Sequence, residues 1–228
     1  MRKFHILKVL GVGLGQSILI IVSVLIAAWV ENLREERREK ELGKVLLLQM
    51  AQELKDDTKT MLRVLPITRN QKIAAEGMAK ALLTGGIPID SIRKYTANLN
   101  WYADYYHNTA TYETFKSIGF NLIKNDHLRL EIVHYYQHRT ELTRNLARVS
   151  YEQLFYSHVP ILQEHFKEFS MVRGSVPIDF DKLRRDNKVI EFFRIYHDLL
   201  DVQYQSEKDL IEQTEHLIRK VEQELAEE

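Results

Sequence analysis

A run of 22 consecutive residues without a formal charge, residues 9–30, constrains the fold of this chain more than any other feature. As a helix rising about 1.5 Å per residue, the run would span about 33 Å, which matches the hydrocarbon thickness of a bilayer. Trp29 closes it, where an aromatic ring suits the membrane interface. Three basic residues precede it: Arg2, Lys3 and Lys8. We therefore predict a basic tail at residues 1–8 and a transmembrane helix at residues 9–30.

A cleaved signal peptide is the alternative for this run. The apolar core of a signal peptide is usually about 7 to 15 residues long, and small residues in an A-x-A pattern precede its cleavage site. The run here is longer, and Ile26 stands directly before Ala27 and Ala28. The transmembrane interpretation is therefore favoured. Within it, Gly11 and Gly15 form a small-xxx-small pair and Gln16 is polar, a combination that predicts helix packing, although glycine is also simply common in such helices.

The flanking charges bear on orientation. Five basic residues follow the run closely, but they alternate with glutamates in one helical pattern, and a long following domain can translocate largely regardless of its charge. We expect a cytoplasmic N-terminus and an extracytoplasmic domain. The whole chain has no net charge, with 32 basic and 32 acidic residues, which argues against a nucleic-acid partner. It contains no cysteine, so neither compartment is excluded.

The rest of the sequence predicts an all-α fold, because apolar residues recur at helical spacing and no segment shows the alternation of a strand. We expect a stalk helix at residues 31–65 that ends at Pro66, a helical bundle at residues 66–180, and a long C-terminal helix at residues 181–228 that packs back along the stalk. Within the bundle, helices are expected at residues 68–84, 90–107 and 111–118 and from Asn125 or Asp126 onward.

The helix after Asn125 has the clearest periodicity, in steps of three and four residues that Arg139 interrupts. Its expected core positions are Leu128, Ile132, Tyr135, Leu142, Leu146 and Val149. The C-terminal helix shows a coiled-coil-like edge, which predicts contacts with another copy or another protein. That interaction edge comprises Leu210, Thr214, Leu217, Val221 and Leu225.

Two stretches resemble a family of bacterial proteins of unknown function, DUF-6090. The first contains the residues 15–22 and 25–29 with Asn32 and a charged run; the second contains Tyr112, Glu113, Ser117, Gly119, residues 122–125, Leu128, Arg129, Ile132, Tyr135 and Tyr136. The resemblance implies a single-pass, mostly helical inner-membrane protein of Gram-negative bacteria with a cytoplasmic N-terminus, and it implies no activity. The chain departs from the family at Gln16, where a glutamate is usual, and in its short N-terminal tail.

The best metal candidate is Glu131 with His134 and His138, three ligand types on one helical face. A di-iron bundle needs a second Glu-x-x-His, which this chain does not contain, so half-exposed amphipathic positions explain these residues more simply. A group of aromatic residues is explained by packing, or alternatively by a ligand pocket. Its members are Trp101, Tyr102, Tyr105, Tyr106, Tyr135, Tyr136, Phe155 and Tyr156. No nucleophile motif or phosphate loop occurs, and no cofactor is expected.

The sequence therefore predicts a non-enzymatic protein that is anchored in the bacterial inner membrane and whose periplasmic helical domain binds another envelope protein or itself. A membrane-anchored small-molecule sensor that signals through a partner is the alternative, and a metal-binding helical protein is the third hypothesis.

Overall fold

The computed structural model describes the backbone of residues 2–102, 106–170 and 172–227, and the side chains of these residues except residues 2–18 and residue 20. Most of this backbone is helical, which confirms the predicted all-α class. The chain divides into two units, unit 1 at Met1–Leu47 and unit 2 at Leu48–Glu228, which are described separately.

Unit 1 belongs to the first helix, α1 (Arg2–Thr84), whose remainder lies in unit 2. Among the described residues, no helix has an apolar stretch long enough to cross a membrane. The predicted span falls largely elsewhere, since the side chains of residues 9–18 and 20 lie outside the described part.

The predicted helix end at Pro66 is wrong, because α1 continues through Pro66 to Thr84. Proline has no N–H, so the Leu62 carbonyl loses its helical hydrogen bond at an expected cost of about 3 kcal/mol. Burial on both sides offsets this cost, since Met61 and Thr68 are 2% and 0% exposed. A continuous buried face therefore overrides the local breaker.

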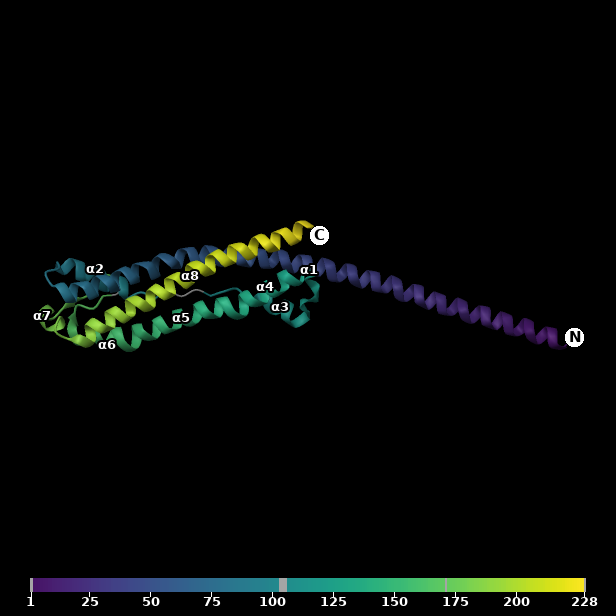
Figure 1. The fold of residues 1–228 in the computed structure, drawn as a ribbon, viewed down its shortest axis with the longest axis horizontal. Coiled ribbons are helices and arrows are strands. Elements are labelled where there is room, and N and C mark those ends of the chain that lie inside the picture. The colour runs from purple at the N-terminus through teal and green to yellow at the C-terminus, as the bar shows by residue number, and fades with distance from the viewer. Residues whose placement is uncertain (1, 103–105, 171, 228) are drawn as a thin grey trace. The chain divides into compact units, whose positions relative to one another are not determined.

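The C-terminal helix α8 (Asn187–Glu227) runs antiparallel to the unit 2 part of α1 and also lies beside α5 (Figure 1). Three pairs fix its register against α1: the ion pair Lys55–Glu222 at 2.6 Å, the hydrogen bond Thr68–Glu207 at 3.0 Å and the ion pair Lys72–Asp201 at 2.5 Å. Later positions of α1 meet earlier positions of α8, as the antiparallel arrangement requires.

Shorter helices complete the bundle. They are α2 (Ile89–Leu99), α3 (Ala110–Ile118), the 3-10 turn η1 (Phe120–Leu122), α4 (Asp126–His134), α5 (Thr140–Gln153), α6 (Val159–His165) and α7 (Phe180–Leu183). Two of the predicted ends rest on local chemistry that the structure confirms. Gly119 caps α3 at φ 118°, and the Asn125 side chain caps α4 by accepting hydrogen bonds from the backbone N–H groups of His127 and Leu128. The helix predicted to reach residue 107 ends earlier, at Leu99.

Two π-helical turns interrupt the long helix that was predicted after Asn125. They are η2 (Tyr135–Arg139), between α4 and α5, and η3 (Leu154–His158), between α5 and α6. Each adds one residue to the helical repeat and rotates the next helix by about 100°. The predicted seam is therefore correct before η2 and wrong after it.

The buried positions of α5 are Thr140, Thr143, Ala147 and Ser150, and each of the last three comes one residue after an expected core residue. Leu142 is 53% exposed, and Leu146 and Val149 are half-buried. Since η2 shifts the phase by one residue, an apolar row that the sequence assigned to the interior lies at the surface.

The far end of unit 2 holds an apolar core shared by α1, α2, α6 and α8. Its largest members include Met78, Leu82, Ile92, Leu99, Leu162, Phe193, Tyr196 and Leu200. A hairpin of two-residue strands, β1 (Phe166–Lys167) and β2 (Val176–Pro177), lies next to it, contrary to the expectation of no strand. The predicted start of the last helix near Asp181 is also wrong, since α7 ends at Leu183 and α8 begins at Asn187.

Candidate functional site

The predicted membrane-packing residues and the predicted α8 interaction edge have different outcomes in the structure. The side chains of Gly11, Gly15 and Gln16, predicted to pack membrane helices, lie outside the described residues. The predicted interaction edge on α8 is buried inside the chain, because Leu210, Leu217 and Val221 are only 2%, 3% and 0% exposed. Leu225 is half-buried. These residues do not form a bare edge, since their apolar spacing is satisfied by intrachain packing.

The proposed metal ligands do not converge. Glu131 has two partners on α8: its carboxylate lies 3.9 Å from His216 Nε2 and 3.6 Å from Lys220 Nζ. His134 instead lies beside His138, with ring centroids 5.1 Å apart. Within the described residues, no group of three His, Asp or Glu side chains is close enough to hold a metal ion. His138 lies in the π-turn η2 and not in the same regular helix as Glu131, and Lys220 and His216 of α8 lie next to the Glu131 carboxylate instead.

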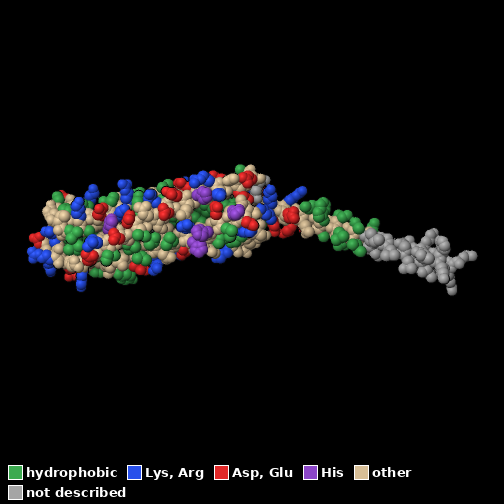
Figure 2. Space-filling model, viewed as in Figure 1, with side chains coloured by type: hydrophobic (Ala, Val, Ile, Leu, Met, Phe, Trp, Pro, Cys, Tyr) green, Lys and Arg blue, Asp and Glu red, His purple; other side chains and the backbone are tan. Residues whose placement is uncertain are grey.

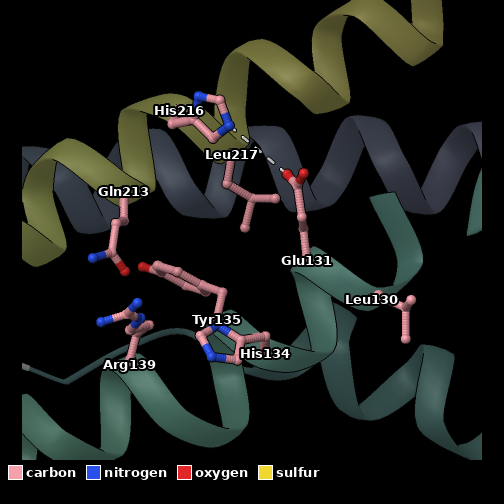
Figure 3. Close-up of a pocket in the computed structure, with 8 residues that line it drawn as sticks. All are labelled: Leu130, Glu131, His134, Tyr135, Arg139, Gln213, His216 and Leu217. Atoms are coloured by element: carbon pink, nitrogen blue, oxygen red, sulfur yellow. Dashed lines mark ion pairs between the residues drawn. The ribbon is translucent and has the colours of Figure 1, made fainter. Parts of the chain in front are cut away.

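Glu131, His134 and His216 line a surface cavity of about 440 Å³, where α4 and η2 face α8 (Figure 3). Its lining comprises Leu130, Glu131, His134, Tyr135, Arg139, Gln213, His216 and Leu217. Figure 3 shows Glu131 pointing toward His216, while the ring of Tyr135 lies across the floor. The cavity thus combines an apolar floor with a guanidinium, two imidazoles and a carboxylate.

The floor of the cavity is fixed by a hydrogen bond between α8 and η2. The hydroxyls of Tyr135 and Thr214 lie 2.8 Å apart, and both side chains are buried. Burial raises the pKa of Tyr135 well above its ordinary value, so the phenol stays neutral at physiological pH. Tyr135 therefore joins η2 to α8 through a neutral, buried hydroxyl.

A second cavity, of about 380 Å³, continues along the same line between α5 and α8 and shares Arg139 and Gln213 with the first. Its remaining lining comprises Leu142, Thr143, Leu146, Asp201, Val202, Gln205, Ser206, Asp209 and Leu210. We call the two cavities together the α5–α8 groove. At its base, the hydroxyls of Thr143 and Ser206 lie 2.8 Å apart and hold the helices at close range.

The aromatic residues considered for a pocket are dispersed. Tyr135 and Tyr136 are buried, whereas Tyr106 and Tyr156 are about 80% exposed. Tyr102 contacts Tyr151 edge-on, with centroids 4.7 Å apart. The ligand pocket considered as an alternative among them does not form as one cluster in the described part of the chain.

A buried polar cluster between α1 and α8 was missed from the sequence. Glu207 is 3% exposed, and its Oε1 accepts hydrogen bonds from Thr68 Oγ1 at 3.0 Å and Gln203 Nε2 at 2.8 Å. Burial raises the pKa of Glu207 to about 7. The spacing of the predicted α8 edge, extended backward from Leu210, reaches both Glu207 and Gln203 and would have found them.

Comparisons with known proteins found no match. No protein-family model, curated protein or solved structure matches the chain. The resemblance to the DUF-6090 family therefore stays a prediction.

Proposed function

We propose that the chain is a non-enzymatic, single-pass inner-membrane protein whose helical unit 2 binds another envelope protein or a second copy of itself. Residues 9–30 would cross the bilayer, with the N-terminus in the cytoplasm and unit 2 in the periplasm. The α5–α8 groove would be the binding surface. The resemblance to the DUF-6090 family accords with this location.

The observation that supports the proposed membrane anchor is the exposed apolar surface of α1 between Leu19 and Val30. Its described large hydrophobic side chains are 37% to 70% exposed: Leu19, Ile21, Val22, Val24, Leu25, Ile26, Trp29 and Val30. These positions cover all sides of the helix, a pattern typical of buried or membrane helices. Figure 2 shows hydrophobic side chains gathered on this part of α1, next to the residues drawn in grey.

The surface of unit 2 has a different character, because Figure 2 shows basic and acidic side chains intermixed over its visible face. Mixed charge suits a water-exposed domain and gives no basic stripe for a polyanion. The groove adds exposed apolar side chains, since Leu142 and Val202 are 53% and 54% exposed. Protein–protein contact is the use that this combination supports best.

Membrane flotation of the full-length protein tests the anchor. We expect the protein to float with carbonate-washed membranes, and the double variant Ile21→Lys/Leu25→Lys to lose most of this association, because a lysine at the bilayer centre costs about 3 kcal/mol. The control is Leu62→Lys/Ile73→Lys, at similarly exposed sites of unit 2. Recovery of the wild type in the wash would refute the anchor.

Orientation is tested by labelling a single cysteine, since the chain has none of its own. Leu83 is 58% exposed, so Leu83→Cys is accessible without disturbing the core. We expect a membrane-impermeant maleimide to label it in intact spheroplasts. Labelling that requires lysis would place unit 2 in the cytoplasm.

A membrane-anchored small-molecule sensor is the second candidate, favoured by the cavity in Figure 3. Its Arg139 guanidinium and apolar floor suit a small carboxylate with an apolar body. Thermal-shift measurements with a panel of such carboxylates test it: stabilisation that is lost in Arg139→Ala supports the sensor, and no shift at millimolar concentrations contradicts it.

A further inference from the structure

The α5–α8 groove exposes an apolar row that the chain does not bury itself. Leu142 and Val202 are more than half exposed, and Leu146 between them is half-buried. The π-turn η2 brings Leu142 and Leu146 into this position by rotating α5. The groove therefore has an apolar centre on both of its walls.

The same groove carries one cation and one anion without partners. Arg139 and Asp209 are both exposed, and neither side chain has a hydrogen bond or ion pair to any residue the structure describes. The other charged groups nearby are already paired, since Asp201 binds Lys72 and Glu131 lies near Lys220. Arg139 and Asp209 are thus the charges available to an outside molecule.

These groups lie at matching levels along the groove. The Thr143–Ser206 hydrogen bond sets a common origin for the antiparallel helices. From it, Arg139 is four residues back along α5 and Asp209 three residues forward along α8, so both are displaced in the same direction, by about 6 and 4.5 Å. Leu146 and Val202 are displaced the opposite way, by about 4.5 and 6 Å.

We propose that the occupant of the α5–α8 groove is the α5–α8 groove of a second copy of this chain, related by a two-fold axis that runs along the groove. This arrangement sets α5 of one copy against α8 of the other. Arg139 then meets Asp209 of the second copy, and Leu146 meets its Val202, with both contacts occurring twice. An isologous interface needs complementary groups at equal levels on one surface, and the groove supplies them.

This inference rests on the proposed interaction role of unit 2, and membrane anchoring would assist it. Two copies held in one membrane have a raised effective concentration, so a modest interface suffices for pairing. The charge pairs lie at the rim and set the register, while the apolar centre supplies most of the binding energy.

Heterotypic disulfide trapping tests the geometry on full-length protein in membranes. One copy carries Leu146→Cys and a first epitope tag, and the other carries Val202→Cys and a second tag; the chain has no native cysteine to interfere. We expect a disulfide-linked product with both tags under mild oxidation. The matched control replaces Val202→Cys with Ile73→Cys, an exposed site outside the groove, and should give none.

Charge reversal tests the pairing itself. We expect Arg139→Asp or Asp209→Arg in both copies to reduce the trapped product about fivefold, because two attractive pairs become repulsive, and we expect the combined double variant to restore it. The control is Arg148→Asp, on α5 but outside the groove lining.

The outcomes separate this inference from the proposed function. Absence of the heterotypic product in membranes that contain the protein overturns the dimer and leaves the anchor intact. Trapping of a different protein at Val202→Cys overturns the second copy as the occupant while retaining the interaction role. A heterotypic product without rescue by the double charge variant overturns the assigned register.

Discussion

Thr68 on α1 and Glu207 on α8 are joined by a hydrogen bond of 3.0 Å in the interior of unit 2, where they are 0% and 3% exposed. Gln203, one turn away, also donates to the same carboxylate oxygen, and the other oxygen of Glu207 has no partner among the described residues. A half-satisfied buried carboxylate of this kind favours its protonated form.

The free energy of unfolding should depend on pH through the ionisation of Glu207. Burial raises its pKa from 4.5 to about 7, so the folded state holds a proton that the unfolded state releases. The stabilising contribution of this group is therefore full below about pH 4.5 and is lost as pH rises toward 7, by about 3 kcal/mol.

We expect Glu207→Gln to match the wild type near pH 4.5 and to exceed its free energy of unfolding at pH 8. Urea unfolding at a series of pH values measures this difference. Buried His158, whose pKa is lowered to about 4 by burial, has the opposite effect on stability, but it is present in both proteins and cancels in the comparison. Glu215→Gln, on the exposed side of α8, is the control. Parallel curves for wild type and Glu207→Gln would contradict the assignment.

Gly174 should be the more sensitive of two glycines with the same backbone conformation. Both Gly174 and Gly86 have positive φ, 73° and 71°. A Cβ at Gly174 would overlap the carbonyl oxygen of Arg93, whereas one at Gly86 would meet nothing within 4 Å. We expect Gly86→Ala to cost about 1 kcal/mol from backbone strain alone and Gly174→Ala to cost several times more. Equal midpoints in urea would show that α2 and the hairpin separate without penalty.

The π-turn η2 should tolerate a deletion that a regular helix does not. Removing the exposed Gln137 converts η2 to regular helix and leaves the facing of α5 unchanged, so we expect a loss below about 2 kcal/mol. Removing Arg144 instead moves Arg148 into the buried place of Ala147, which costs more because a charge is desolvated. Thermal unfolding of the two deletion variants compares them. The explanation of the shifted seam fails if Gln137 deletion is the more damaging.

Pro66 should be a site where stability can be gained. Pro66→Ala restores the N–H that the Leu62 carbonyl lacks, and we expect a net increase of about 1 kcal/mol after allowing for the greater freedom of the unfolded chain. Arg69→Ala, an exposed position in the same helix, is the control and should change little. A lower melting temperature for Pro66→Ala would mean that packing of unit 2 depends on the proline.

Local signals were sufficient where the cause lies in a few neighbouring residues. The helix stop at Gly119 and the cap predicted at Asn125 or Asp126 follow from side-chain and backbone chemistry within one turn, and the structure has the stop at Gly119 and the cap at Asn125. Leu142 shows the opposite case. Its spacing fits a helix whose apolar pattern is interrupted at Arg139, the last residue of η2, but this interruption by itself does not show that the turn adds one residue to the repeat.

The all-α class, the charge-free N-terminal run and the long amphipathic helices can be read from the amino-acid sequence alone, because helical periodicity is a property of the chain. Which faces are buried depends on tertiary packing: α8 covers its own apolar edge against the bundle, Glu131 turns toward His216 and Lys220, and Leu142 and Val202 line an open groove. Which side chains are buried depends on the rotational phase of each helix and on its register against its neighbours. The π-turn η2 sets the phase of α5, and hydrogen bonds such as Thr68–Glu207, between residues more than a hundred positions apart, hold the register of α8 against α1.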